Sequence, residues 1–281
     1  MKWSAIVDKV NKIDAGTLKS ILEDNSAAFY LLIDVRQPGE YAKSRIPGAV
    51  SMPLNELVEG NIILPEKKPL FIYSRSGIRS KAAAQWFISQ GFSEVTEIEG
   101  GFDQWQGNHA FGRFEMNLQI VNQNVDFPDA FRMSYAMEEG LRRFYLEIAK
   151  ETLNPFFQKL YRRLASFEVE HKQALAAAYA EHAGLDVRPE DFERQQLQLL
   201  EGGGYLDETL IQTLSNTASV HDVFSLAIAF ETQAFDFYIR LSRYADNPEA
   251  KNFFLEMADA EKAHLALVTQ EMDAYLNQES L

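Results

Sequence analysis

The pattern of hydrophobic and polar positions changes between residues 107 and 128. Before this point, short apolar runs at residues 29–35, 69–73 and 95–98 are separated by polar segments, and helical spacing follows the second run. Short apolar runs bounded by turn residues are typical of buried strands, and their alternation with helices predicts a parallel α/β sheet. From residue 128 onward the apolar positions recur at helical spacing almost to the end of the chain.

This second pattern predicts four helices. They are expected from Pro128 to Glu151, from Pro155 to about His182, from about Ser219, and from Pro248 to about Leu276. Asn154-Pro155 and Asn247-Pro248 combine an N-cap residue with proline at the first helical position, which predicts a short turn within each helix pair. A connection of some 35 residues, rich in glycine, separates the pairs. Two helix pairs, each closed by a short turn and joined by one long crossover, have the connectivity of a ferritin-like four-helix bundle.

The predicted organisation is therefore two domains, for which 281 residues are sufficient. Residues 1–107 form the α/β domain, residues 108–127 a polar linker, and residues 128–281 the helical bundle. His109 in the linker is expected to be a surface residue.

The composition of the chain excludes several classes of function and partner. Hydrophobic residues make up 46% of the chain and charged residues 24%, as in ordinary globular proteins. No apolar run approaches the ~20 residues of a membrane span, and the N-terminus lacks a signal-peptide core, so a cytoplasmic protein is expected. With no cysteine, disulfides and thiolate chemistry are excluded. The net charge of −14 falls mostly on residues 109–281, which disfavours nucleic acids and anionic membranes as partners.

The helical half contains an internal repeat of carboxylates and histidines. Glu138, Glu168 and His171 are followed, each 93 positions later (231 − 138), by Glu231, Glu261 and His264. Phe144-Tyr145 and Phe237-Tyr238 show the same displacement. One Glu and one Glu-x-x-His from each of two helix pairs are the ligand set of a di-iron or di-manganese carboxylate bundle.

A duplicated helical hairpin whose Glu and His are surface charges is the alternative. The equal spacing and the matched flanking residues argue against it, because helical spacing also places Glu and His of each Glu-x-x-His on one face. The repeat also excludes neighbouring carboxylates: Glu139 and Glu170 have Thr232 and Ala263 as counterparts.

These residue types suit a pair of divalent cations. Four carboxylates can neutralise two such ions, and each histidine offers a neutral nitrogen, which suits iron, manganese or zinc. Two iron ions are predicted, bridged by Glu168 and Glu261, with His171 and His264 as terminal ligands. Tyr145 and Tyr238 follow Glu138 and Glu231 by seven residues (145 − 138), so their hydroxyls can donate to ligand carboxylates. They can equally be core aromatics. His182 and His221 are expected to be structural.

The first domain contains a series of short motifs: Asp34-Val35-Arg36, Glu40-Tyr41, Ile46-Pro47-Gly48-Ala49, the strand, loop and helix at 70–87, and Gly100-Gly101 with Trp105. In their order and spacing, these motifs resemble the rhodanese homology domain. In that family a cysteine opens the loop and carries a persulfide, held by backbone N–H groups at a helix N-terminus. Here the loop is Ser74-Arg75-Ser76-Gly77-Ile78-Arg79.

Serine at this position changes the expected chemistry. A hydroxyl is too weakly acidic to replace a thiolate and cannot hold persulfide sulfur. No histidine lies in residues 1–108, and Arg45 stands where many family members carry histidine. We therefore expect no sulfurtransferase activity, with anion binding retained by the loop, Ser74 to Arg79. Whether Ser74 is natural or replaces an original cysteine stays open.

The second domain resembles rubrerythrins, which are di-iron peroxidases of the ferritin-like superfamily that reduce hydrogen peroxide. Rubrerythrins usually carry a Cys-ligated iron for electron delivery, which this chain cannot form. They also tend to have a further Glu where this chain has Ala234. The resemblance implies an oxidoreductase that reduces peroxide or dioxygen with electrons from an external reductant protein or reductase. The alternative is a non-enzymatic iron-binding or sensing protein that docks through its first domain; a homodimer stays open for either.

Overall fold

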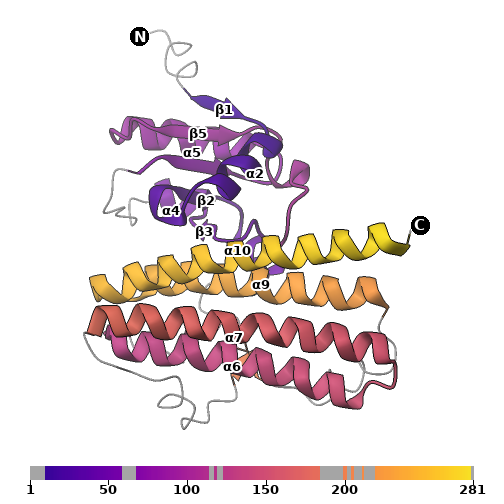
Figure 1. Ribbon diagram of the computed structural model, residues 1–281. Coiled ribbons are helices and arrows are strands. Elements are labelled where there is room, and N and C mark those ends of the chain that lie inside the picture. The colour runs from indigo at the N-terminus through magenta and orange to yellow at the C-terminus, as the bar shows by residue number, and fades with distance from the viewer. Residues whose placement is uncertain are drawn as a thin grey trace. The chain divides into compact units, whose positions relative to one another are not determined.

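The computed structural model describes residues 10–58, 68–113, 117–118, 123–183, 199–200, 204–205, 211 and 219–279. The chain divides into two compact units, Met1–Met116 and Asn117–Leu281, and each is described by itself. The fold class predicted from the sequence is confirmed: a parallel α/β sheet forms the first unit and long helices form most of the second (Figure 1).

The described part of the first unit contains a five-stranded parallel sheet in the order β1-β5-β4-β2-β3. The strands are β1 (Asn11–Ile13), β2 (Leu31–Asp34), β3 (Val50–Ser51), β4 (Leu70–Tyr73) and β5 (Val95–Ile98). The three apolar runs of the sequence are the three central strands. β2 is buried along its whole length, as expected for a strand with both faces covered.

Helices connect the strands of this sheet. They are α2 (Ala15–Asp24), α3 (Pro38–Lys43), α4 (Leu54–Val58) and α5 (Ile78–Ser89), with 3₁₀ turns η1 (Ala27–Phe29) and η2 (Gly101–Gln104). Ala83, Ala84 and Phe87 of α5 pack into the same hydrophobic core as Ile33 and Ile72 of the central strands. The sheet thereby fixes the position of the loop between β4 and α5, which holds Ser74.

Gly101 holds that loop against η2. Its φ is +59°, which favours glycine, and a Cβ on it would overlap the Ser74 carbonyl and lie 2.8 Å from the Arg75 carbonyl. Gly101→Ala is therefore expected to destabilise the first unit by about 2 kcal/mol or more. Urea denaturation followed by circular dichroism measures this loss. Gly39→Ala is the matched control, because nothing lies within 4 Å of the added Cβ; an equal loss in both variants would contradict the explanation.

Among the described residues, the second unit has four long helices that run alongside one another (Figure 1). They are α6 (Phe127–Glu151), α7 (Pro155–Ala183), α9 (Val220–Tyr244) and α10 (Pro248–Glu279). The side chain of Asn154 accepts a hydrogen bond from the Phe156 N–H at 2.9 Å, and that of Asn247 accepts one from the Glu249 N–H at 2.8 Å. These caps close the short turns of the α6–α7 and α9–α10 hairpins, as the Asn-Pro pairs predict.

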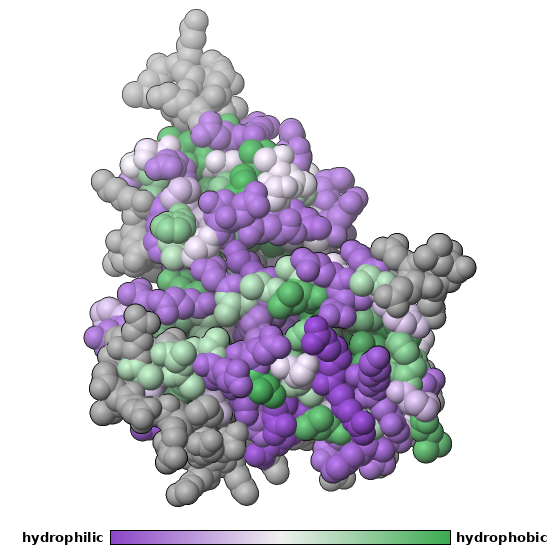
Figure 2. Space-filling view, in the orientation of Figure 1, coloured by the Kyte–Doolittle hydropathy of each residue, from purple (hydrophilic) through white to green (hydrophobic). Residues whose placement is uncertain are grey.

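The long connection between the hairpins contains a feature that the sequence did not predict. β6 (Leu199–Leu200) and β7 (Gly204–Tyr205) form an antiparallel pair. Much of the rest of this connection lies outside the described residues. The face of the bundle visible in Figure 2 is largely polar, with scattered apolar residues. None of the described helices combines the length and hydropathy needed to cross a bilayer.

The first unit continues past residue 107, where the linker was expected to begin. Arg45 and Ala110 exchange backbone hydrogen bonds of 2.8 and 3.0 Å. The fully buried Arg45 guanidinium donates to the Gly112 carbonyl at 2.6 Å and lies over the Tyr41 ring. His109 is exposed, with its Nδ1 2.9 Å from the Ser44 hydroxyl. Residues 108–112 thus belong to the first unit, and α6 begins at Phe127 within the stretch predicted as linker.

Candidate metal centre

The repeated carboxylates and histidines form two clusters in the interior of the second unit. Among the described residues, the groups able to hold a metal ion are Glu138, Glu168 and His171, and Glu231, Glu261 and His264. In each group the candidate ligand atoms all lie within 4.8 Å of one another. Each cluster draws one glutamate from the first helix of its hairpin and a Glu-x-x-His from the second.

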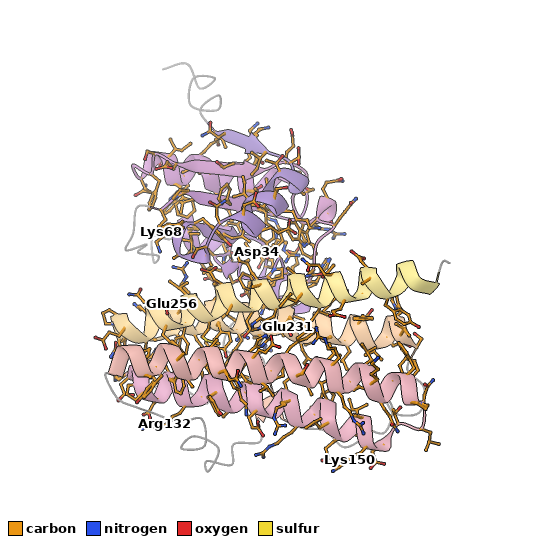
Figure 3. The ribbon with its side chains drawn as sticks, viewed as in Figure 1. Asp34, Lys68, Arg132, Lys150, Glu231 and Glu256 are labelled. Carbon is orange, nitrogen blue, oxygen red and sulfur yellow. The ribbon has the colours of Figure 1, made fainter. Side chains whose placement is uncertain are left out.

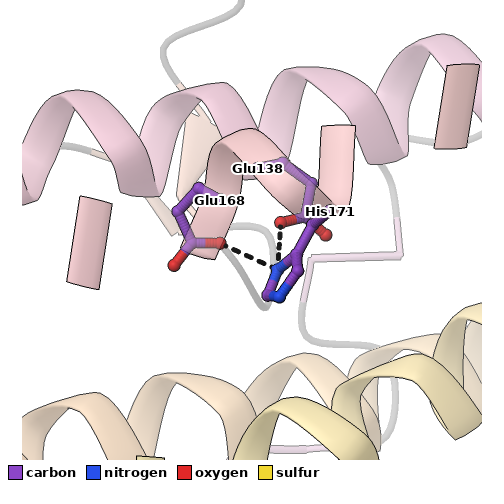
Figure 4. A group of neighbouring side chains, drawn as sticks. All are labelled: Glu138, Glu168 and His171. Carbon is purple, nitrogen blue, oxygen red and sulfur yellow. Dashed lines mark hydrogen bonds and ion pairs between the residues drawn. The ribbon is translucent and has the colours of Figure 1, made fainter. Parts of the chain in front are cut away.

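The first cluster is organised around the His171 ring. Its Nδ1 lies 3.1 Å from Glu168 Oε2 and 3.3 Å from Glu138 Oε2 (Figure 4). One turn of α7 separates Glu168 from His171, so both point to the same side of the helix. Both glutamates are almost completely buried.

The second cluster repeats this geometry. His264 Nδ1 lies 3.1 Å from Glu261 Oε2 and 3.6 Å from Glu231 Oε2. Figure 3 shows Glu231 between the helices of the bundle, whereas Lys150 extends from its outer surface. The rings of His171 and His264 are parallel, with centroids 2.9 Å apart, so the two clusters adjoin. The repeat in the sequence is therefore a repeat in space.

The donors fit divalent cations. Burial alone would raise the pKa of Glu138, but the hydrogen bond and charge of His171, together with the charge of His264, hold it below the ordinary value. Among the described residues, no hydrogen-bond donor reaches Glu138 Oε1. Burying four carboxylates beside two histidines costs free energy unless cations neutralise them, and carboxylate oxygen with imidazole nitrogen suits iron, manganese or zinc.

The tyrosines proposed as donors are buried beside equivalent partners. Tyr145 stacks with Tyr161 at a centroid distance of 6.5 Å, and Tyr238 stacks with Phe254 at 6.4 Å. Tyr161 and Phe254 are also related by 93 positions (254 − 161). Donation by Tyr145 and Tyr238 to the ligand carboxylates stays a prediction.

Glu139 and Glu170, which the repeat excludes from the predicted ligands, lie outside the two clusters. Glu139 turns away from the cluster and binds Lys172 at 2.5 Å, with Arg142 and Arg143 each at 2.7 Å. These cations outweigh burial and lower the pKa of Glu139 to about 2. Glu170 is exposed.

Two histidines outside the clusters were expected to be structural. His221 is instead exposed near the start of α9, with its Nδ1 3.4 Å from the Ser225 hydroxyl. The side chain of His182 lies outside the described residues.

Several polar groups of the loop after β4 are engaged within the first unit. The Gly77 N–H donates to the buried Ser74 hydroxyl oxygen at 3.1 Å. Arg79 binds Glu40 at 2.8 Å, and Arg75 lies 3.4 Å from Asp103. Ser76 and Ile78 are exposed. Anion binding by Ser74, Arg75, Ser76, Gly77, Ile78 and Arg79 stays a prediction.

Comparisons with known proteins agree with this architecture. The family model described as "Rhodanese-like domain" matches residues 14–108. A sulfurtransferase of Allochromatium vinosum is 34% identical over 96 residues, which cover 34% of this chain and 88% of that protein. The chain belongs to the rhodanese-like family. A second family model, described as "Rubrerythrin", matches residues 222–281, which include most of α9 and all of α10.

Further relatives match the same part of the rhodanese-like chain. Thiosulfate sulfurtransferase GlpE of Coxiella burnetii is 33% identical over 79 residues, 28% of this chain and 74% of that protein. Among solved structures, a rhodanese-related protein from Thermoplasma volcanium is 28% identical, covering 36% of this chain and 97% of its own, with a TM-score of 0.31. The rhodanese-like domain of Anabaena Alr3790 is 30% identical, covering 36% and 78%, with a TM-score of 0.33. The two family models together describe a rhodanese-like domain fused to a rubrerythrin domain.

Proposed function

We propose that the second unit binds two iron ions and reduces hydrogen peroxide, or dioxygen, with electrons from an external donor. The observation that carries the proposal is the pair of buried clusters, each with two carboxylates and one imidazole, related by the internal repeat. The rubrerythrin match over residues 222–281 supports it for the second half of the site.

The protein residues would hold the ions and shape their surroundings. Glu138, Glu168 and His171 would hold one ion, and Glu231, Glu261 and His264 the other, with Glu168 and Glu261 bridging. When bound, the iron pair supplies the two electrons that reduction of a peroxide bond requires. Phe144 and Phe237, each fully buried, pack in the core of their hairpins and help to exclude water.

Metal content and peroxide consumption test this proposal. Protein purified without chelators and loaded anaerobically with ferrous iron is expected to bind two ions per chain. Addition of hydrogen peroxide should oxidise the bound iron, and a chemical reductant should sustain repeated peroxide consumption. Two bound ions with turnover no faster than that of free iron would instead favour the non-enzymatic iron-binding protein. One ion or none would contradict the site.

We propose that the first unit has no role in sulfur transfer. Because Ser74 cannot carry a persulfide, the thiosulfate:cyanide assay is expected to give no thiocyanate above the rate without protein. The measurement uses the full chain, with one of the matched sulfurtransferases as the positive control. Thiocyanate formation that depends on protein concentration would contradict this prediction.

A further inference from the structure

A buried carboxylate lies beneath the loop that holds Ser74. Glu97 projects from β5 and is 3% exposed. Its Oε1 is 3.3 Å from the Ser80 hydroxyl, which is in turn 3.4 Å from the Ser74 hydroxyl. Oε1 is also 3.5 Å from where a Cβ on Gly77 would stand. A single hydroxyl group therefore separates this carboxylate from the position at which the family carries its cysteine.

The charge of Glu97 is weakly compensated. Lys12 Nζ lies 3.9 Å from Glu97 Oε2, but the Lys12 side chain is 44% exposed and lies equally close, at 3.8 Å, to Glu99. No hydrogen-bond donor among the described residues reaches Glu97 Oε2. Burial raises the pKa of Glu97 more than the attraction of Lys12 and the hydrogen bond from Ser80 lower it. The surroundings therefore already disfavour one negative charge, and an anion bound beside Glu97 would either be repelled by it or require Glu97 to take up a proton.

This charge lies where an anion would otherwise bind. The first turn of α5 presents N–H groups and the positive end of the helix dipole, which favour an anion next to Ser74. The Glu97 carboxylate contacts the same turn through Ser80. A second negative charge a few ångströms away, in an interior of low dielectric constant, would be strongly repelled.

We propose that Glu97 excludes anions from the loop of residues 74–79, so that sulfur transfer is blocked by Glu97 as well as by Ser74. The anion-binding role expected for this loop would then be absent. The proposal concerns the first unit alone and does not depend on the metal centre.

The chemistry of sulfur transfer shows why such a charge would matter. In the reaction with thiosulfate, a thiolate attacks the outer sulfur, a sulfur–sulfur bond forms, and sulfite leaves with the electron pair of the broken bond. Cyanide then removes that sulfur as thiocyanate and restores the thiolate. Thiolate, thiosulfate and persulfide are all anions, so a fixed carboxylate opposes every species on the path.

The test introduces a thiol and measures its ionisation. Because the chain has no cysteine, Ser74→Cys provides the sole thiol. Its alkylation by iodoacetamide, followed against pH in the full chain, reports the thiolate fraction. The charged groups around Glu97 are Lys12 from β1, Lys81 from α5 and Glu99, which follows the last residue of β5. None of these three is altered in the comparison of Ser74→Cys with Ser74→Cys/Glu97→Gln.

The thiol of Ser74→Cys is expected to have a pKa at or above the ordinary value of about 8.5. Adding Glu97→Gln, which keeps a hydrogen-bonding partner for Ser80, should raise the alkylation rate at pH 7 by about tenfold or more. The matched control is Glu99→Gln, which removes the same charge from an exposed side chain that shares Lys12. It should change the rate less than about twofold.

Thiocyanate production is the second readout. Ser74→Cys alone is expected to be nearly inactive in the thiosulfate:cyanide assay, and Ser74→Cys/Glu97→Gln measurably active. The proposal is overturned if the thiol of Ser74→Cys already titrates well below 8.5, or if Glu97→Gln and Glu99→Gln have equal effects. If the double variant does not fold, the thiol titration of Ser74→Cys alone still tests the proposal, because a thiol pKa well below 8.5 would overturn it.

Discussion

Glu168→Ala and Glu261→Ala are each expected to abolish binding of both metal ions, whereas Glu138→Ala and Glu231→Ala each leave at least one ion bound. The proposed bridging carboxylates hold both ions, so their loss affects the whole centre, while each terminal glutamate serves one ion. The measurement is iron content per chain after anaerobic loading and desalting. Glu170→Ala is the control, because Glu170 is exposed and its counterpart in the repeat is already alanine, Ala263.

The same variants separate a metal site from a structural hydrogen-bond network. Without metal, removing Glu168, Glu231 or Glu261 relieves repulsion among the buried carboxylates, so the melting temperature of the metal-free protein should stay unchanged or rise. Glu138→Ala also removes the carboxylate that His171 and His264 stabilise, so it should lower this melting temperature slightly. With iron, the unsubstituted protein should gain stability that the bridging variants lack. If all four variants bind the same amount of iron, or if each strongly destabilises the metal-free protein, the glutamates serve the fold and the site assignment is wrong.

Arg240→Met is expected to lower the free energy of unfolding of the second unit by about 1.5–3 kcal/mol, because it removes the buried, charge-assisted hydrogen bond from Arg240 to Asp236. Arg240 Nε lies 2.9 Å from Asp236 Oδ2, and the two side chains are 1% and 0% exposed. Urea denaturation measures the loss.

The internal repeat supplies the control for this pair. The counterpart of Arg240 (240 − 93) is Glu147, which forms an exposed ion pair with Lys150 at 2.7 Å. Glu147→Gln removes that pair at the same helical position and should cost about 0.5 kcal/mol or less. A loss below about 1 kcal/mol for Arg240→Met would show that the Asp236 carboxylate is stabilised by other groups.

Local signals in the sequence were enough for most of the fold. The apolar runs correspond to β2, β4 and β5 because these strands are buried, and Asn154-Pro155 and Asn247-Pro248 mark helix starts because their caps need only neighbouring residues. β1 and β3 were missed, since three and two residues carry no periodicity. Their pairing with β5 and β2 depends on residues far away in the sequence.

The candidate sites, like the strands, could be predicted only where the signal lies in residues close together in the sequence or in the repeat. The equal spacing within the repeat selected six residues that the fold brings into two adjoining clusters, because helical periodicity translates spacing into direction. Glu97 gave no such signal: a carboxylate at an inward-facing position of a short strand looks like a surface residue until the sheet is assembled. Lys172 was missed for a related reason, since its bond to Glu139 crosses from α7 to α6.

The contacts of Arg45 also decide where the first unit can be separated from the second. The family resemblance ends near residue 107, which would suggest cutting the chain there. Such a truncation would remove the Ala110 backbone that pairs with Arg45 and the Gly112 carbonyl that accepts from its buried guanidinium. A stable isolated first unit should therefore retain the chain at least through Gly112.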